Sequence, residues 1–131
     1  MTTCSPITIF DVSGTPRPKA RARVTSKGAH TPKATADWER QVGLCALLAG
    51  LRPHKDHVAV TIWLCGALRG DADNYGKAIL DALNGIAYED DRQVVQIAVH
   101  LLRGRGALCR VLVERLTDGW ADEVTIPEVT T

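Results

Sequence analysis

The chain has 131 residues, the size of a single domain with one hydrophobic core. Its apolar fraction of 45% and charged fraction of 24% are typical of a soluble globular protein. It shows no signal-like N-terminal segment and no apolar run long enough to cross a bilayer, so we expect a cytoplasmic protein rather than a secreted or membrane one. Its four cysteines form no C-x-x-C pair, which argues against a zinc site and suits a reducing compartment.

The charge of the chain is unevenly distributed, although the net charge is only +1. Residues 12–36 carry six basic side chains and no acid, whereas residues 71–91 carry six acids and one lysine. A basic segment attracts phosphates, and an acidic cluster can hold a cation. The distribution therefore favours a polyanionic substrate that is cut with the help of a metal.

The first expected elements are a strand and a long basic segment. Residues 6–12 alternate apolar and polar side chains, which predicts a strand that ends at Ser13-Gly14. Residues 15–33 follow, here called the basic arm. Pro16 and Pro18 keep its start extended, so basic residues at every second position would share one side. The arm is either a phosphate-binding segment or a solvated loop. Its basic residues are Arg17, Lys19, Arg21, Arg23, Lys27 and Lys33.

A helix is predicted over residues 35–50, with Thr35 as its cap and Gly50 as its stop. Its stripe of Trp38, Val42, Cys45 and Ala49 indicates core packing. Residues 58–65 are apolar and β-branched, which predicts the best strand of the chain.

The second half of the chain predicts a helix over residues 74–84 and a strand over 93–102. A turn at 104–106 would lead to a last strand, 107–116, that pairs back on the one before it. We therefore expect one small two-layer α+β domain over residues 1–116. Its order is β-α-β-α-β-β, with a four-stranded mixed sheet and two helices. Residues 117–131 form an acidic C-terminal tail.

The stretch GDADNYGK, residues 70–77, carries the chemistry. Asp71 and Asp73 lie between a strand and a helix, and Lys77 follows one helical turn later. Asp90 and Asp91 precede the next strand, and pairing of adjacent strands would bring them close to the first two. Grouped carboxylates repel one another unless a cation lies between them, and Mg²⁺ is the usual occupant.

Each of these residues also has a simpler explanation. Asp73 is a good helix cap, Lys77 and Asp81 suit a surface ion pair, and residues 89–91 suit a solvated turn. Their coincidence favours metal-dependent phosphodiester chemistry. A calcium loop is excluded because Tyr75 and Ala82 occupy positions that need ligands, and no Rossmann or P-loop motif occurs.

The chain resembles the RusA family of Holliday-junction resolvases, found largely in phages and prophages. The resemblance spans most of residues 5–116. It is carried by GTPRPKARARV and HTPKATADWE in the arm and, more specifically, by GDADNYGKAILDALNGIAYEDDRQV. It implies a homodimeric, Mg²⁺-dependent endonuclease, with Mn²⁺ as a substitute ion, that cleaves four-way junction DNA in recombination and repair.

The resemblance also implies roles for single residues. Asp71 and Asp73 match metal ligands, Lys77 matches an essential lysine, and the third carboxylate is Asp91 or its neighbour Asp90. Asn74 matches the motif asparagine, and we assign it to DNA contact together with the arm. Two other functions remain open: a nuclease acting on other branched or duplex DNA, and a non-catalytic DNA-binding protein.

Overall fold

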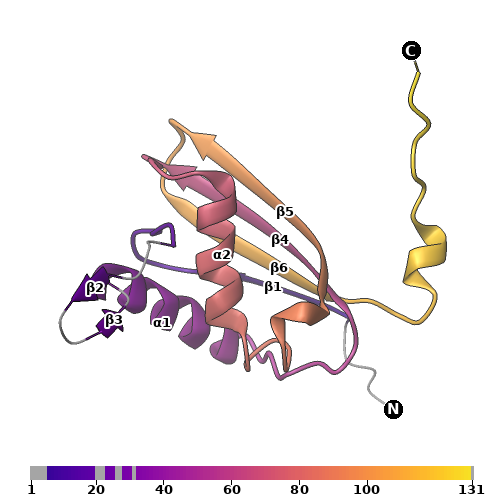
Figure 1. The fold of residues 1–131 in the computed structure, drawn as a ribbon, viewed down its shortest axis with the longest axis horizontal. Helices are drawn as coiled ribbons and strands as arrows, with labels where there is room; N and C mark the ends of the chain where they lie inside the picture. Colours follow the sequence, from indigo (N-terminus) through magenta and orange to yellow (C-terminus); the bar gives the residue numbers. More distant parts are fainter. Residues whose placement is uncertain (1–5, 20–22, 26–27, 31, 131) are drawn as a thin grey trace.

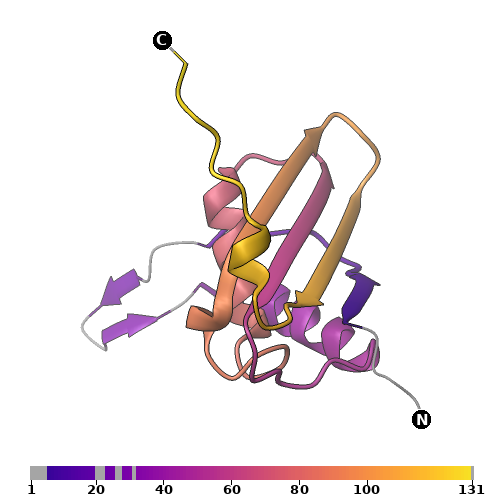
Figure 2. The same cartoon turned by 90° about the vertical axis from the view of Figure 1, so that its right-hand side faces the viewer.

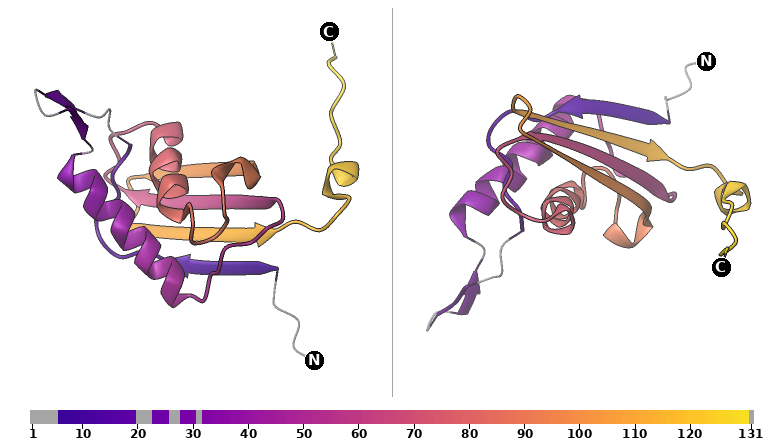
Figure 3. Two further views of the ribbon diagram at one scale, coloured as in Figure 1. Left: turned by 60° about the horizontal axis from the view of Figure 1, so that its bottom comes forward. Right: turned by 90° about the horizontal axis from the view of Figure 1, so that it is seen from above.

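A four-stranded sheet with two helices on one of its faces forms the body of the protein (Figures 1 and 3). The structure is a computed structural model and describes residues 6–19, 23–25, 28–30 and 32–130. The strands are β1 (Ile7–Asp11), β4 (Val58–Gly66), β5 (Val94–Arg103) and β6 (Leu108–Arg115), in the order β1-β6-β4-β5. β4 runs parallel to β5 and antiparallel to β6, which confirms the predicted mixed sheet and the α+β class.

The last two strands do not pair with each other, so the predicted hairpin is wrong. β4 lies between β5 and β6. It is the most apolar strand, and pairing on both of its edges buries it at the centre of the sheet. The connection from β5 to β6 crosses the end of β4 at Gly66. There Gly104 N donates to Gly66 O at 3.4 Å, and Gly66 has a φ of +128°, which favours glycine.

The helices are α1 (Lys33–Leu48) and α2 (Ala72–Leu83), and both begin two residues before their predicted starts. Thr35 is buried inside α1 and is not its cap, because the helix begins directly after Pro32. Gly50 follows the end of α1 with a φ of +94°, as predicted. The buried face of α1 includes Ala46, whereas Ala49 lies exposed outside the helix.

The basic arm contains two short strands that the sequence did not indicate. β2 (Arg23–Thr25) and β3 (Gly28–His30) pair antiparallel with each other and stand apart from the main sheet (Figure 1). The expectation that alternate basic residues share one side falls partly outside the described residues, because Arg21, Lys27 and the side chain of Arg23 are not described.

Two short 3-10 helices complete the fold, η1 (Asp91–Gln93) before β5 and η2 (Trp120–Glu123) after β6. In η2, Trp120 Nε1 donates to His57 Nδ1 at 3.2 Å, and the chain then runs out from the body to its C-terminus (Figure 2). The three described cysteines are free thiols, and burial raises the pKa of Cys109 to about 12. Within the described ranges, no helix is both long and apolar enough to span a membrane.

Candidate active site

An open hollow of about 470 Å³ runs along α2, and here it is called the acidic hollow. Asp73 and Lys77 line it from α2, and Asp91 lines it from η1. Helical spacing explains the α2 contribution, because residues four apart lie on the same side of a helix. The full lining is Ala72, Asp73, Lys77, Leu80, Asp81, Asp91, Ile97 and Val99.

Asp71 and Asp73 lie exposed at the start of α2. Asp71 has the N-cap position, but its side chain makes no capping hydrogen bond. Asp73 lies inside the first turn, where the helix dipole favours a negative charge. Asp73 is therefore not the cap of this helix. Asp71 does not line the acidic hollow, although it is only two residues from Asp73.

Asp91 lies toward the other end of α2, so the expectation that the neighbouring strand brings it beside Asp71 is wrong. Because β4 and β5 are parallel, the start of β5 lies beside the start of β4, at the opposite end of the sheet from the end of β4. α2 runs back from one end of the sheet to the other, and Asp73 and Asp81 are about 12 Å apart along its axis. Within the described part of the chain, no group of three or more His, Cys, Asp or Glu side chains is gathered for a metal ion.

Asp90 and Asp91 have different surroundings. Asp90 Oδ1 accepts from Arg92 N at 2.9 Å and Oδ2 accepts from Arg92 Nη2 at 3.3 Å, within a capping box completed by Gln93. The backbone hydrogen bond from Arg92, followed by that from its side chain, lowers the pKa of Asp90. Asp91 is exposed and faces the acidic hollow, where Asp90 contributes no lining. The geometry thus favours Asp91 over Asp90 as the third carboxylate.

Tyr88 lies near the carboxylates of Asp91 and Asp81. Its hydroxyl donates to Leu80 O at 2.5 Å, and the side chain is fully buried. Burial raises the pKa of Tyr88, and the charges of Asp91 and then Asp81 raise it further. Asp91 and Asp81 thus both lie close enough to Tyr88 for their charges to act on its hydroxyl.

Lys77 is the cation that lines the acidic hollow. Its ammonium lies 3.6 Å from Asp81 Oδ1, and its side chain is 61% exposed. A long, exposed lysine paired this loosely can turn toward a phosphate with little loss. Asp81 is the carboxylate that pairs loosely with Lys77 on this side of α2.

Lys19 joins the arm to both helices, a role that its position in a basic run did not indicate. Its Nζ lies 2.7 Å from Glu39 Oε1 and 3.1 Å from Asp81 Oδ2. Burial opposes the charged form of Lys19, but hydrogen bonds to Glu39 and Asp81 outweigh it and raise its pKa. Lys19 Nζ thus binds two carboxylates of the protein and is not available to bind a phosphate.

The arm also packs directly against residues 70–77, here called the acidic motif. Lys19 N donates to Asn74 O at 2.8 Å. A Cβ at Gly70 would lie 2.7 Å from Pro18 Cβ, so only glycine allows this approach without a shift. The side chain of Asn74 is exposed at this contact. The first part of the arm and the acidic motif are therefore one unit, although more than forty residues separate them in sequence.

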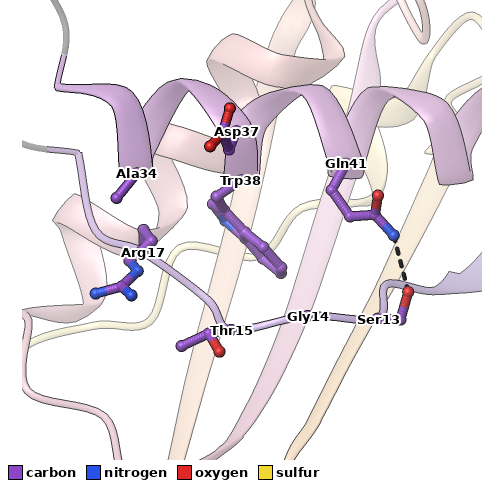
Figure 4. A pocket seen from close by; sticks show the side chains of 8 residues that line it. All are labelled: Ser13, Gly14, Thr15, Arg17, Ala34, Asp37, Trp38 and Gln41. Atoms are coloured by element: carbon purple, nitrogen blue, oxygen red, sulfur yellow. Dashed lines mark hydrogen bonds between the residues drawn. The ribbon is translucent and has the colours of Figure 1, made fainter.

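A second hollow, of about 370 Å³, lies where the arm meets α1 (Figure 4). Arg17 is exposed at one end, the ring of Trp38 points toward the Gly14–Thr15 backbone, and Gln41 Nε2 donates to Ser13 Oγ at 2.8 Å. Lys33 is 89% exposed and pairs with Asp37 at 2.8 Å. Arg17 and Lys33 therefore remain accessible to an anionic ligand. The full lining of this second hollow is Ser13, Gly14, Thr15, Arg17, Ala34, Asp37, Trp38 and Gln41.

In this small α+β protein, carboxylates and a lysine along an open hollow, beside an arm with exposed basic residues, are chemically suited to phosphodiester cleavage in nucleic acid. A family model described as endodeoxyribonuclease RusA matches residues 13–114, and the chain belongs to this family. Membership indicates a nuclease of the Holliday-junction-resolving type. No curated protein matches the chain.

Proposed function

We propose that this protein is a Mg²⁺-dependent endonuclease that resolves Holliday junctions by paired phosphodiester cleavage during recombination and repair. The observation that carries the proposal is that Asp73, Lys77 and Asp91 line one open hollow beside the basic arm. Membership of the RusA family supports the same reaction class. Four-way junction DNA is the proposed substrate.

The donor set of the hollow fits Mg²⁺. This ion prefers oxygen ligands and is held by one or two carboxylates, with water and substrate phosphate completing its coordination. Asp71 and Asp73 would supply two carboxylates from the start of α2, and Asp91 would supply one toward the other end of the hollow, so the three would not all coordinate one ion in this conformation of the described residues. Such a site needs no closed cage of protein ligands, and Mn²⁺ would suit the same oxygen donors. When bound, the ion supplies an activated water and positive charge beside the phosphate.

The other residues have supporting roles in the proposal. Lys77 contacts the scissile phosphate or the leaving oxygen and stabilises the charge that develops there. Arg17 and Lys33, together with Arg21, Arg23 and Lys27 but not Lys19, contact backbone phosphates, which position the substrate without reading its sequence. Asn74 has an exposed side chain beside the arm and contributes a polar contact to the DNA.

The proposed active form is a homodimer. A two-fold dimer carries two equivalent hollows, and the symmetry of the protein would then match that of a four-way junction. Cuts made at the two hollows on opposite strands would give two duplexes that can be ligated. This pairing distinguishes the proposal from a nuclease that nicks duplex DNA once.

The test replaces single carboxylates by amides. Asp73→Asn and Asp91→Asn should each lower the rate of Mg²⁺-dependent junction nicking by roughly 100-fold or more, because loss of a ligand should cost at least as much as loss of an outer partner. Junction affinity should be little changed. Asp118→Asn, an exposed carboxylate in the C-terminal tail, is the matched control. Full nicking activity in Asp73→Asn and Asp91→Asn would refute the proposed site.

A further inference from the structure

The short connection between β4 and α2 leads directly into the acidic motif. Here residues 68–70 of this connection are called the entry loop. Asp71 follows it in an extended conformation, with φ −82° and ψ 156°, and its side chain makes no capping hydrogen bond. The backbone of Asp71 is held on one side by the entry loop and on the other by α2, where Tyr75 N donates to Asp71 O at 3.1 Å. Whatever holds the entry loop therefore also helps to place the backbone of Asp71.

Arg103 donates hydrogen bonds to two backbone carbonyls of the entry loop. Its Nη1 donates to Leu68 O at 2.9 Å, and its Nη2 donates to Gly70 O at 3.0 Å. The planar guanidinium presents both donors in one rigid fork, which a lysine cannot reproduce. Two carbonyls separated by one residue are thus fixed by a single side chain from the end of β5.

Tyr75 holds the amide side of the same loop. Its hydroxyl accepts from Arg69 N at 3.2 Å and from Gly70 N at 3.3 Å. The ring is only 3% exposed and is packed in the core, so the hydroxyl is a fixed acceptor. Between them, Tyr75 and Arg103 satisfy four backbone groups of three consecutive residues.

The entry loop also supports the basic arm. Gly70 lies against Pro18, and Lys19 N donates to Asn74 O in the first turn of α2. A shift of the loop would therefore move both the carboxylate at its end and the arm that rests on it. β5 also joins the two parts of the site, since Asp91 precedes its start and Arg103 is its last residue.

We propose that Arg103 and Tyr75 are positioning residues that hold the entry loop so that Asp71 is preorganised for the metal and the arm is preorganised for DNA. The proposal rests on the nuclease function proposed above. Neither side chain lines the acidic hollow, so neither needs to touch the substrate. Their effect acts through backbone geometry, as outer partners of metal ligands do.

The test uses two conservative variants of the full chain. Arg103→Lys keeps the charge and loses the fork, whereas Tyr75→Phe keeps the buried ring and loses the hydroxyl. Arg105→Lys is the matched control, because Arg105 lies exposed in the next turn. Melting temperature is measured first. Then Mg²⁺ binding to the free protein is measured by calorimetry, junction nicking is titrated with Mg²⁺, and exchange of the Arg69 and Gly70 amides is followed by NMR.

Both variants should bind Mg²⁺ about 10-fold more weakly, with the Mg²⁺ requirement for nicking raised by the same factor. The two amides should exchange faster, and Arg105→Lys should match the wild type. Unchanged Mg²⁺ binding and unchanged amide exchange in Tyr75→Phe and Arg103→Lys would overturn the proposal. A wild-type protein that nicks no junction would instead refute the proposed function, and the amide exchange would still decide whether these side chains hold the loop.

Discussion

The ammonium of Lys19 lies 3.1 Å from the carboxylate of Asp81, and this ion pair joins the basic arm to the acidic helix α2. Asp81 also pairs loosely with Lys77, so one carboxylate contacts both a structural cation and the proposed catalytic one. Lys19 reaches Glu39 of α1 as well. The side chain is only 22% exposed, and it links three segments of the chain. The arm is thus anchored at its start by a residue that sequence position assigns to DNA contact.

Lys19→Met should destabilise the protein, because it leaves the Glu39 and Asp81 carboxylates without their shared cation. We expect the free energy of unfolding to fall by roughly 1–2 kcal/mol in urea denaturation. Lys33→Met removes an exposed ion pair with Asp37 and should change stability by less than about 0.5 kcal/mol. Equal effects of the two substitutions would contradict the structural role of Lys19.

The contribution of Lys19 should disappear at alkaline pH. Its pKa is raised above 10.5 in the folded protein, so its stabilisation is fully present below that pH and is lost as pH rises through the higher folded value. The difference in unfolding free energy between wild type and Lys19→Met should therefore be constant near neutral pH. It should shrink above pH 10.5, and a difference that grows with pH there would contradict the assignment.

Gly70→Ala should disturb the contact between the arm and the acidic motif. The added methyl would lie 2.7 Å from Pro18 Cβ and 3.0 Å from Tyr75 Cε2, so the backbone or the proline must move. Overpacking of this kind costs roughly 1–3 kcal/mol, which thermal or urea unfolding would measure. Gly106→Ala meets nothing within 4 Å and is the matched control. A Gly70→Ala protein as stable as Gly106→Ala would show that the arm does not pack here.

Substitution of Asp90 should affect stability, whereas substitution of Asp91 should affect nicking. Asp91→Ala should abolish nicking and leave the melting temperature nearly unchanged, because its side chain faces the acidic hollow. Asp90→Ala should lower the melting temperature and leave most of the nicking, since this carboxylate caps η1. The opposite pattern would make Asp90 the third carboxylate.

Arg17→Ala should weaken junction binding in a salt-dependent way. If the exposed guanidinium neutralises one phosphate, its loss reduces the slope of log K against log salt by about 1. The measurement is a salt titration of junction affinity, with exposed Lys55→Ala as the control. An unchanged slope would remove Arg17 from the DNA interface.

Much of this fold was predictable because it rests on local patterns. The β-branched run at β4, the apolar periodicity of α2 and the glycines after both helices predicted these elements. Strand neighbours could not be predicted in the same way. A glycine-rich turn between two strands indicates a hairpin, yet the connection at Gly104 crosses β4, whose apolar side chains gain most from a central place.

The sequence predicted which residue types the candidate site contains, but it predicted their positions in space less well. Spacing along one helix placed Asp73, Lys77 and Asp81 together, because that spacing is local. The position of Asp91 depended on β4 and β5 being parallel, which no short motif records. Lys19 is 20 positions from Glu39, and Arg103 is 35 positions from Leu68 and 33 from Gly70, so only the folded chain shows these contacts.

The central claim is tested most directly by incubating the purified protein with three DNA substrates under Mg²⁺: a four-way junction, a flap and a linear duplex. Strand-specific products are resolved on denaturing gels. We predict that the junction is cleaved in preference to the other two, with paired nicks on opposite strands, and that Asp73→Asn binds the junction without cutting it. Equal cleavage of all three substrates, or no Mg²⁺-dependent cleavage of the junction, would contradict the account.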